Sequence, residues 1–594
     1  MEQKIVRNTF LKFFLPTVAG SVMLSVISMT DLIIAGNFVG EIALTAISLA
    51  LPVIIFVQII SALFGMGGAI TLSIRMGEGN LEECSRIFTL SLISSFVISM
   101  VALILGLTFL EPLILLLGGN YGMIMEQAKQ YIGMLFWGMP FLVLSPIMIT
   151  YLRNDNEQGY AMVCVVTAGL GNIAFSVFFV TVLNWGIVGI AAGTVAAEFL
   201  SCLLAGCRLF HKKRMFHLVR TKADLQTYVS ILKPGLALAV IFLSQILLTI
   251  VINHILCAYG GSEGVAVYAV MKYLINFMFA LFDGVTGAIQ PMLGIYYGEK
   301  EEKNIRYTVR YSFSAMLMIA VVMLAAMEGF GQQLCVLFHV ESESLTSMTV
   351  YAMHVLGFYC LAAAVMTFMN AFYRCTGKEN VSFHFSILDN LVFPISFVLL
   401  FAKVFGMGTE GVWIGLLTSG LSTMAVWFFY CIWRKQGFLL LDREAFQRPP
   451  EELHVIYPAQ LENIPKLLSD VERYCETEEI GVKLEYYINL AIEELVVNVI
   501  SMAQECMKSS YYVDVRITPM EDGSTQLRIR DNLIQFNPAD VGESDALGGA
   551  EEVLNREAVG NGGVNELGIS IVKKIAKEYS YRRTIGYNNF LVTI

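Results

Sequence analysis

The sequence predicts an all-α polytopic membrane protein with twelve transmembrane helices, followed by a soluble α/β domain. Of the 594 residues, 56% are hydrophobic and 15% are charged, whereas soluble proteins carry roughly 25% charged residues. Apolar stretches of about 20 residues, long enough to cross a bilayer core, recur from Phe13 to Trp433. Residues 436–594 contain no such stretch and hold 15 basic and 26 acidic side chains. One large soluble enzyme is thereby excluded.

The predicted spans follow the apolar stretches in order. They are 13–35, 44–72, 88–117, 131–151, 160–183, 186–210, 231–258, 265–290, 307–330, 347–372, 382–404 and 412–433. If the chain begins in the cytoplasm, the loops on that side carry 21 Lys and Arg, and the other side carries Lys129 and Lys403. Basic loops are retained in the cytoplasm. We therefore expect an inner or plasma membrane protein with both termini cytoplasmic and an uncleaved first helix.

The membrane part repeats itself after six spans. The loop at 76–83 is echoed at 297–302, and Arg153 and Arg374 are 221 residues apart. Because the repeat covers an even number of spans, its halves share one orientation and should surround a central cavity. We expect two six-helix lobes and an alternating-access carrier. The expected boundaries are 1–218 and 219–435 for the lobes, 436–452 for a linker and 453–594 for the soluble domain.

Several motifs resemble the multidrug and toxic-compound extrusion (MATE) family. They are the Gly-Glu-Gly loop at 77–79, Arg-x5-Gly-Tyr-Ala-Met at 153–162, and Asn172 followed by the glycine-rich segment 186–194. The resemblance covers about residues 8–435. It implies export of amphipathic, often cationic, small molecules through the lipid bilayer, driven by inward movement of H⁺ or Na⁺. No nucleic acid partner is expected.

Two other functions stay open. A flippase of the same superfamily would move a lipid-linked saccharide and would need several basic side chains for the diphosphate, of which the spans offer Lys272. A membrane-anchored regulator would use its spans to sense a ligand without transporting it.

Asp31 in the first span is the sharpest candidate for ion coupling. An ionisable side chain within a span costs a few kcal/mol, and no cation stands near Asp31 in the sequence. Apolar surroundings disfavour the charged carboxylate, so Asp31 can exchange a proton. The alternative is a buried aspartate that bonds backbone groups and supports helix packing.

The resemblance to the MATE family implies partners for Asp31. Asn172 and Thr194 match the family's ion site, whereas its second aspartate is Ser176 here. The lost charge disfavours Na⁺, which prefers charged oxygen ligands. Glu198 follows Thr194 by one helical turn and either returns a carboxylate to the cluster or faces water at the cytoplasmic end of its span.

The eighth span carries three polar residues, Lys272, Asn276 and Asp283. Their spacing places them on roughly one helix face. We expect them to line the substrate cavity, with Asp283 available to a cationic substrate. Asp389 in the eleventh span is a similar but more isolated carboxylate.

The soluble part alternates between helical and strand patterns. A helix is predicted at 483–507, a hairpin with strands at 511–518 and 525–530, a second helix at 567–578, and a closing strand that ends at Ile594. This order resembles the GHKL ATPase fold, in its anti-sigma-factor serine-kinase-like version, over roughly 455–594.

The GHKL resemblance implies a site for Mg-ATP. Asn498 would hold Mg²⁺ against the phosphates, Glu494 would act as the catalytic base, and Asp531 would read the adenine. The helix that contains Gly568 would receive phosphate at its N-terminus.

Two residues depart from the GHKL pattern. Leu533 stands where a glycine lets the backbone approach the base, and Glu566 replaces a phosphate-loop glycine. The domain is therefore either a nucleotide-binding domain or serine kinase with degenerate glycine motifs, or a regulatory module that docks a cytoplasmic protein. Enzymatic activity stays open. A sensor histidine kinase is disfavoured because His454 is the only histidine of the domain.

Overall fold

The computed structural model forms two compact units, Met1–Ala445 and Phe446–Ile594. The residues described here are 2–117, 122–210, 214–222, 224–337, 342–441, 446, 452–506, 511–520, 524–532, 566–585 and 587–594. For some of these residues only the backbone is described, and their side chains are not. They are residues 2, 24, 26–33, 41, 44, 262, 337, 498, 499, 501–506 and 566–570.

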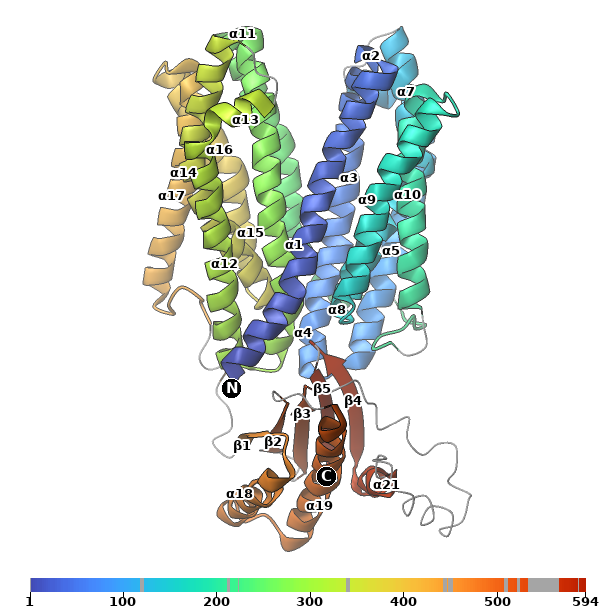
Figure 1. Ribbon diagram of the computed structural model, residues 1–594, viewed down its shortest axis with the longest axis vertical. Helices are drawn as coiled ribbons and strands as arrows, with labels where there is room; N and C mark the ends of the chain where they lie inside the picture. Colours follow the sequence, from blue (N-terminus) through green and yellow to red (C-terminus); the bar gives the residue numbers. More distant parts are fainter. Residues whose placement is uncertain are drawn as a thin grey trace. The chain divides into compact units, whose positions relative to one another are not determined.

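The first unit is helical and consists of two helix groups (Figure 1). The first helix group contains α1 (Glu2–Ile34), η1 (Ala35–Val39), α2 (Glu41–Leu49), α3 (Leu51–Ile60), η2 (Ser61–Met66), α4 (Gly67–Glu78), α5 (Leu81–Thr108), α6 (Leu110–Leu116), α7 (Met123–Trp137), α8 (Met139–Asn154), α9 (Gln158–Thr181) and α10 (Gly186–Leu209). The second helix group contains α11 (Leu225–Gly298), α12 (Glu302–Gly329), α13 (Gly331–Leu337), α14 (Glu343–Cys375), α15 (Glu379–Ile387), η3 (Leu388–Val392), α16 (Phe393–Leu399), η4 (Leu400–Val404) and α17 (Gly408–Arg434).

These helices fall on the predicted spans. Among the described residues, ten helices are long and apolar enough to cross a membrane, and eleven if the α7–α8 pair, bent by 51°, is one span. α1 covers the first predicted span. α11 contains two spans, which separate at Gly261 (φ 55°), where a glycine adopts left-handed backbone angles without a steric penalty.

The two helix groups touch where α4 meets α11. A Cβ atom on Gly77 would overlap the carbonyl oxygen of Ile295, and a Cβ atom on Gly67 would overlap that of Ile231. The hydroxyl of Thr71 also donates to the carbonyl of Ser230 over 2.7 Å. Glycine therefore lets the backbones of the two groups approach each other closely at this contact.

The segment that connects the two groups is fastened to α5. Phe216 is fully buried, with its ring 4.9 Å from that of Phe88. The backbone N–H of His217 donates to Ser85 over 3.2 Å, and that of Val219 donates to Thr89 over 3.0 Å. These contacts therefore attach residues 214–222 to the first helix group.

An ion cluster fixes the start of this segment. Arg214 donates to Asp155 and to Glu157, each over 2.8 Å. Burial raises the pKa of Asp155, although the hydrogen bond and charge of Arg214 act in the opposite direction. Asp155 thus depends on Arg214 to remain charged in its buried position.

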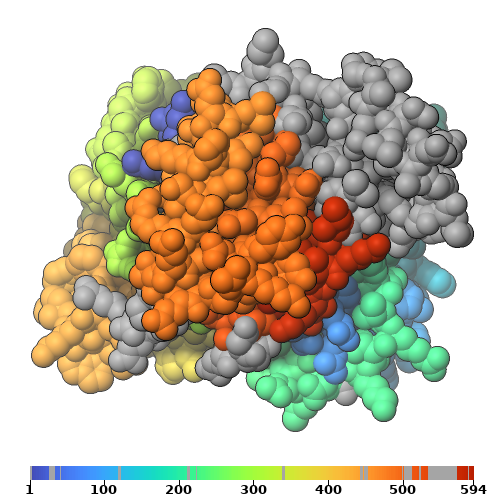
Figure 2. Space-filling model, turned by 90° about the horizontal axis from the view of Figure 1, so that it is seen from below, coloured from blue at the N-terminus to red at the C-terminus, as the bar shows by residue number. Residues whose placement is uncertain are grey.

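The second unit is a five-stranded antiparallel sheet with helices on one face (Figure 1). Its elements are β1 (Leu453–Pro458), α18 (Ile464–Thr477), α19 (Val482–Cys506), β2 (Tyr512–Pro519), β3 (Thr525–Asp531), α21 (Glu566–Ile575), β4 (Glu578–Thr584) and β5 (Tyr587–Thr593). The strand order is β1-β2-β3-β5-β4. Figure 2 shows orange residues, which include α18 and α19, beside the red C-terminal residues.

The predicted hairpin is β2–β3, and the two predicted helices are α19 and α21. The structure also contains three elements that the sequence patterns did not predict, namely β1, α18 and β4. The core lies between the sheet and the helices and includes Leu495, Val515, Ile529 and Phe590, all nearly inaccessible to solvent.

The other sheet face carries a buried charge cluster. Asp514 on β2 accepts from Arg530 on β3 over 2.7 Å and pairs with His454 on β1 at 2.8 Å. Burial opposes ionisation of Asp514, but the charge of Arg530 and the hydrogen bond with His454 hold its pKa well below the usual range. The cluster therefore links the three neighbouring strands.

Candidate functional site

A polar pair lies inside the first helix group, between α9 and α10. The side-chain amide of Asn172 donates to the hydroxyl of Thr194 over 2.9 Å, and that hydroxyl donates to the carbonyl of Ile190 over 3.2 Å. Asn172 is only 5% exposed. Among the described residues, its Oδ1 atom has no hydrogen-bond partner. The pair therefore presents one buried acceptor oxygen.

Ser176 lies in the contact between the same two helices. It is fully buried, and its hydroxyl donates to the carbonyl of Ile190 over 3.3 Å. A Cβ atom on Gly193 would overlap Ser176. Ser176 thus faces the backbone of α10, and the glycine allows this close approach.

Glu198 lies one turn beyond Thr194 on α10. Its half-buried carboxylate interacts with the side chain of Ser145 on α8. Ser145 also donates to Ser201 over 3.1 Å. The structure therefore places Glu198 within the helix bundle, turned toward α8, whereas Thr194 is turned toward α9.

Asp31 belongs to α1, and its side chain lies outside the described residues. α1 packs along α9, and η1, the segment that follows Asp31, packs against both α9 and α10. The helices that carry Asp31, Asn172 and Thr194 are thus neighbours.

The predicted cavity residues lie on the second half of α11. Lys272 is half-buried, and Asn276 and Asp283 are exposed. The charge of Arg374 on α14, whose side chain is only 6% exposed, acts on Asp283. Asp283 is therefore a membrane-depth carboxylate with an accessible surface and a cationic neighbour.

Arg153 and Arg374 are inward-facing residues that the sequence analysis used only as markers of the repeat. Nη1 of Arg153, on α8, lies 3.5 Å from the position of a Cβ atom on Gly287 of α11. Arg153 thus reaches from the first helix group to the second, one turn from Asp283. The sequence signal that could have identified both arginines as site residues is their 221-residue offset, because this offset gives them equivalent positions in the two halves of the repeat.

The candidate nucleotide residues lie around α19 and β3. Glu494 on α19 is half-buried, and burial, together with the charge of Glu493, raises its pKa. Asn498 lies on α19 and Gly568 on α21, but their side chains, like the whole of Leu533, lie outside the described residues.

Asp531 is the residue that the GHKL resemblance assigns to adenine recognition. It pairs with Val513 across the sheet and so faces the helix layer, as the GHKL resemblance requires. However, Asp531 is fully buried, and its Oδ1 atom accepts from Asn588 on β5 over 2.8 Å. In this conformation one carboxylate oxygen of Asp531 is thus engaged by Asn588 on the neighbouring strand.

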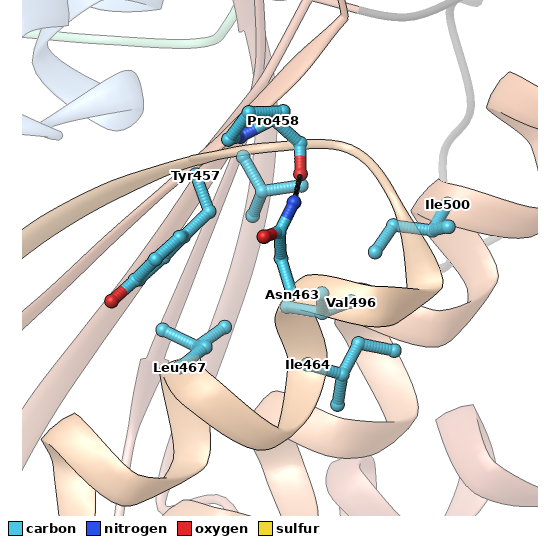
Figure 3. A pocket seen from close by; sticks show the side chains of 8 residues that line it. Tyr457, Pro458, Asn463, Ile464, Leu467, Val496 and Ile500 are labelled. Atoms are coloured by element: carbon cyan, nitrogen blue, oxygen red, sulfur yellow. Dashed lines mark hydrogen bonds between the residues drawn. The ribbon is translucent and has the colours of Figure 1, made fainter.

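A pocket lies elsewhere in the second unit, between β1, α18 and α19 (Figure 3). It is lined by Tyr457, Pro458, Asn463, Ile464, Leu467, Val496, Ile500 and Val513. Asn463 closes one side by donating to the carbonyl of Pro458 over 3.1 Å. None of the candidate nucleotide residues lines this apolar pocket.

Comparisons with known proteins match both units. Residues 16–178 and 236–400 match the MatE family profile, and residues 457–593 match the histidine kinase-like ATPase domain. The probable multidrug resistance protein YoeA of Bacillus subtilis is 23% identical over 444 residues, covering 71% of this chain and 93% of that protein. The multidrug export protein MepA of Staphylococcus saprophyticus is 20% identical over 430 residues, covering 71% and 93%.

Solved structures share the fold of the first unit. An outward-facing multidrug resistance MATE family transporter of the MOP superfamily superposes with a TM-score of 0.66 at 22% identity, over 72% of this chain and 95% of that one. A MOP superfamily transporter from Pyrococcus furiosus, described as having a binding pocket of reverse polarity, superposes with a TM-score of 0.67 at 21% identity, over 74% and 97%. The sequence resemblances are thus confirmed: this chain belongs to the MATE family and carries a histidine kinase-like ATPase domain in residues 457–593.

Proposed function

We propose that the protein is a secondary active exporter, which moves amphipathic cationic molecules outward in exchange for H⁺. The observation that carries this proposal is the buried Asn172–Thr194 pair. Its helix α9 packs against α1, which bears Asp31, and its helix α10 packs against η1, the segment that follows α1. The relatives are described as multidrug resistance and multidrug export proteins, which supports a broad range of substrates.

In this proposal, Asp31 carries the coupling proton. The Oδ1 atom of Asn172 is an acceptor, so it stabilises a neutral carboxylic acid, which has a hydrogen to donate, and repels a carboxylate. The Thr194 hydroxyl fixes the amide so that this oxygen is presented. Glu198, held by Ser145, is the second proposed carboxylate of the coupling region.

We propose H⁺ as the coupling ion because the region offers few ligands for Na⁺. Hard cations prefer several charged oxygen atoms. Ser176 supplies a neutral oxygen, and that oxygen is turned toward the backbone of α10. Protonation of a single carboxylate requires no such set of ligands.

The proposed substrate cavity is lined by Lys272, Asn276 and Asp283. Asp283 is the proposed anchor for a cationic substrate, since its side chain is accessible. The positive charge of Arg374 beside it weakens this attraction, so a bound cation would be held loosely enough to leave.

We propose alternating access with the α4–α11 contact as the closed end. The distribution of basic loops places this end on the cytoplasmic side, so the conformation described here would open outward. Because residues 214–222 are fastened to α5, we place the hinge between the helix groups at the start of α11. The proposed moving lobes are 1–218 and 219–435.

The second unit is proposed to be a cytoplasmic regulator. A nucleotide or a cytoplasmic protein would act through the linker at 436–452 by favouring one transporter conformation. The size of the effect is limited by the difference in the ligand's affinity for the two conformations.

The test is an efflux assay with the full-length protein in proteoliposomes, using ethidium as the cationic probe. H⁺ and Na⁺ gradients are imposed separately. Ethidium movement driven by the H⁺ gradient alone is the expected result. Movement driven only by the Na⁺ gradient would overturn the choice of ion, and failure of ethidium to move under either gradient would overturn the proposed function for cationic dyes.

A disulfide across the closed end tests alternating access. Ser73 on α4 faces Gly294 on α11, where a Cβ atom would lie 2.8 Å from that of Ser73. A disulfide needs its two Cβ atoms about 3.5–4.5 Å apart, so the double variant Ser73→Cys/Gly294→Cys should join the helix groups on oxidation after a backbone shift of about 1 Å. The background replaces the exposed Cys207 and Cys257 by serine. We expect oxidation to stop efflux and reduction to restore it, while the Ser73→Cys single variant transports under both conditions.

A further inference from the structure

The chain folds back on itself directly after the last helix of the second helix group. α17 ends at Arg434, and we call the segment that follows it, residues 435–441, the hook. Three residues of the hook have left-handed backbone angles, namely Lys435 (φ 55°), Gly437 (φ 72°) and Leu440 (φ 48°). Such angles are rare for lysine and leucine, so contacts with the neighbouring helices must hold the hook in this shape.

Ring stacking attaches the hook to α17. The ring of Phe438 lies 5.6 Å from that of Trp427 and 5.8 Å from that of Phe428. These two helix residues precede Phe438 by 11 and 10 positions, so the hook runs back along the helix that it follows. Phe438 is 52% exposed. The hook is therefore a surface attachment, and its opening does not require the helices to unfold.

A single phenol attaches the hook to α14. The hydroxyl of Tyr373 donates to the carbonyl of Phe438 over 2.9 Å and accepts from the indole N–H of Trp427 over 2.7 Å. Tyr373 is fully buried and lies in the last turn of α14. One hydroxyl therefore joins α14, α17 and the hook.

The end of α14 that carries Tyr373 also meets α11. Gly377 follows Tyr373 by four residues, and a Cβ atom on Gly377 would lie 2.7 Å from the phenol oxygen of Tyr297. Tyr297 precedes Gly298 on α11, and Gly298 lies against Gly77 of α4 at the contact between the two helix groups. The hook is therefore connected, through the end of α14, to this contact.

The first helix group ends in an equivalent arrangement. Tyr151 stands 222 positions before Tyr373. Phe216 stands 222 positions before Phe438, in the segment that connects the two helix groups. The rings of Tyr151 and Phe216 lie 6.1 Å apart. A tyrosine and a phenylalanine thus attach the chain at both places where it leaves a helix group, once before the second helix group and once before the second unit.

We propose that the hook is the element through which the second unit controls transport, with the Tyr373 hydroxyl as its fastening point. The inference rests on the proposed exporter and its regulator and names the residues that connect them. When the hook is attached, a change in the second unit is transmitted along the linker to α14 and α17, and from α14 to the closed end. When the hook is detached, the closed end loses this support and no longer responds to the second unit.

Cysteine labelling at the closed end tests the support that the hook provides. Ser73→Cys places a thiol on α4 at this end, and its reaction with a maleimide, measured by mass spectrometry on the full-length protein in detergent, reports how often the end opens. Tyr373→Phe and Phe438→Ala should each increase the labelling about 2- to 30-fold. Tyr430→Phe is the matched control, because the Tyr430 hydroxyl accepts from Arg434 over 3.2 Å and is not part of the hook's contacts. It should leave the labelling unchanged.

Ethidium efflux tests the connection to the second unit. A protease site inserted after Pro450 allows the linker of the full-length protein to be cut before reconstitution into proteoliposomes. Cutting should change the efflux rate when the hook is attached. It should have no effect on Phe438→Ala, whose hook is already detached. Because the Phe438 side chain is half exposed, this variant decides the test even if Tyr373→Phe folds poorly.

Unchanged labelling in both Tyr373→Phe and Phe438→Ala would overturn the inference. A cut that affects the protein with an attached hook no more than it affects Phe438→Ala would also overturn it. Failure of wild-type efflux would count against the proposed function, whereas the labelling would still decide whether the hook supports the closed end.

Discussion

Asn172 on α9 donates its amide to Thr194 on α10 over 2.9 Å, while its own oxygen has no hydrogen-bond partner among the described residues. A buried acceptor without a donor costs about 1–3 kcal/mol. The neighbouring helix α1 carries Asp31, a residue that gains a donor hydrogen when it is protonated. This relationship is the structural basis of the proposed proton coupling.

The first prediction concerns Asp31→Asn. The amide preserves the shape of the side chain but cannot release a proton, so H⁺-driven ethidium efflux should be lost while the protein inserts and folds normally. Glu111→Gln, at an exposed carboxylate paired with Lys129, is the control and should transport at the wild-type rate. Wild-type efflux by Asp31→Asn would show that another group carries the proton.

The second prediction concerns the close approach of α9 and α10. Gly193→Ala should destabilise the protein by about 1–3 kcal/mol, because overpacking forces a shift of the backbone around Ser176. Gly159→Ala is the control, since a Cβ atom at Gly159 meets nothing within 4 Å. The measurement is unfolding in detergent. Equal stability of the two variants would mean that α9 and α10 separate more easily than the contact indicates.

The third prediction concerns the ion cluster of the connecting segment. Arg214→Met leaves the buried Asp155 without its cation and should cost about 3–5 kcal/mol. Arg208→Met breaks a more exposed pair with Glu157 and should cost about 0–1 kcal/mol.

The double variant Arg214→Met/Asp155→Asn should recover most of the stability lost in Arg214→Met, because no unpaired charge remains buried. The free energy of unfolding in detergent separates the three variants. A loss in Arg208→Met as large as that in Arg214→Met would contradict the assigned role of Asp155.

The fourth prediction is a pH dependence of the second unit. The folded-state pKa of Asp514 lies below its unfolded value of about 3.9, so its stabilisation is complete above that pH and declines as the pH falls toward the folded-state pKa. Arg530→Met should reduce the protection of β2 and β3 amides from hydrogen exchange at pH 7. The difference from wild type should shrink below about pH 4. A constant difference down to pH 2 would exclude this linkage.

The fifth prediction concerns nucleotide binding by the full-length protein. Asp531 is buried against Asn588, and Leu533 and Glu566 replace glycines, so calorimetry should detect weak or no Mg-ATP binding. Leu533→Gly/Glu566→Gly should bind more tightly, and Asn498→Ala added to that pair should remove the gain. Micromolar binding by the unaltered protein would show that the missing glycines matter little.

The periodic elements were predictable because their signals are local. Apolar stretches marked the spans, and the β2–β3 hairpin and the helices α19 and α21 were indicated by alternation and helical spacing. β1 and β4 were harder, since an edge strand is specified by its pairing with a neighbour as much as by its own pattern.

The sequence predicted which residues belong to the candidate site, but it did not predict how their side chains are oriented. Asn172 and Thr194 were expected together and do form a hydrogen bond. Ser176 stands at the position of the second aspartate of the family's ion site, and the structure shows that its hydroxyl is turned toward the α10 backbone. The direction of each side chain depends on how its helix is rotated against its neighbours, which residue spacing along one helix does not specify.

The sequence by itself determined the membrane and soluble parts, the internal repeat and the residues able to carry a proton, because hydropathy and residue chemistry are properties of the chain. Only the tertiary structure decided that Arg153 reaches Gly287 and that Asn588 donates a hydrogen bond to Asp531. These contacts join residues that are 134 and 57 positions apart. Long-range contacts of this kind are set by helix packing and strand pairing, which bring together residues that no local pattern relates.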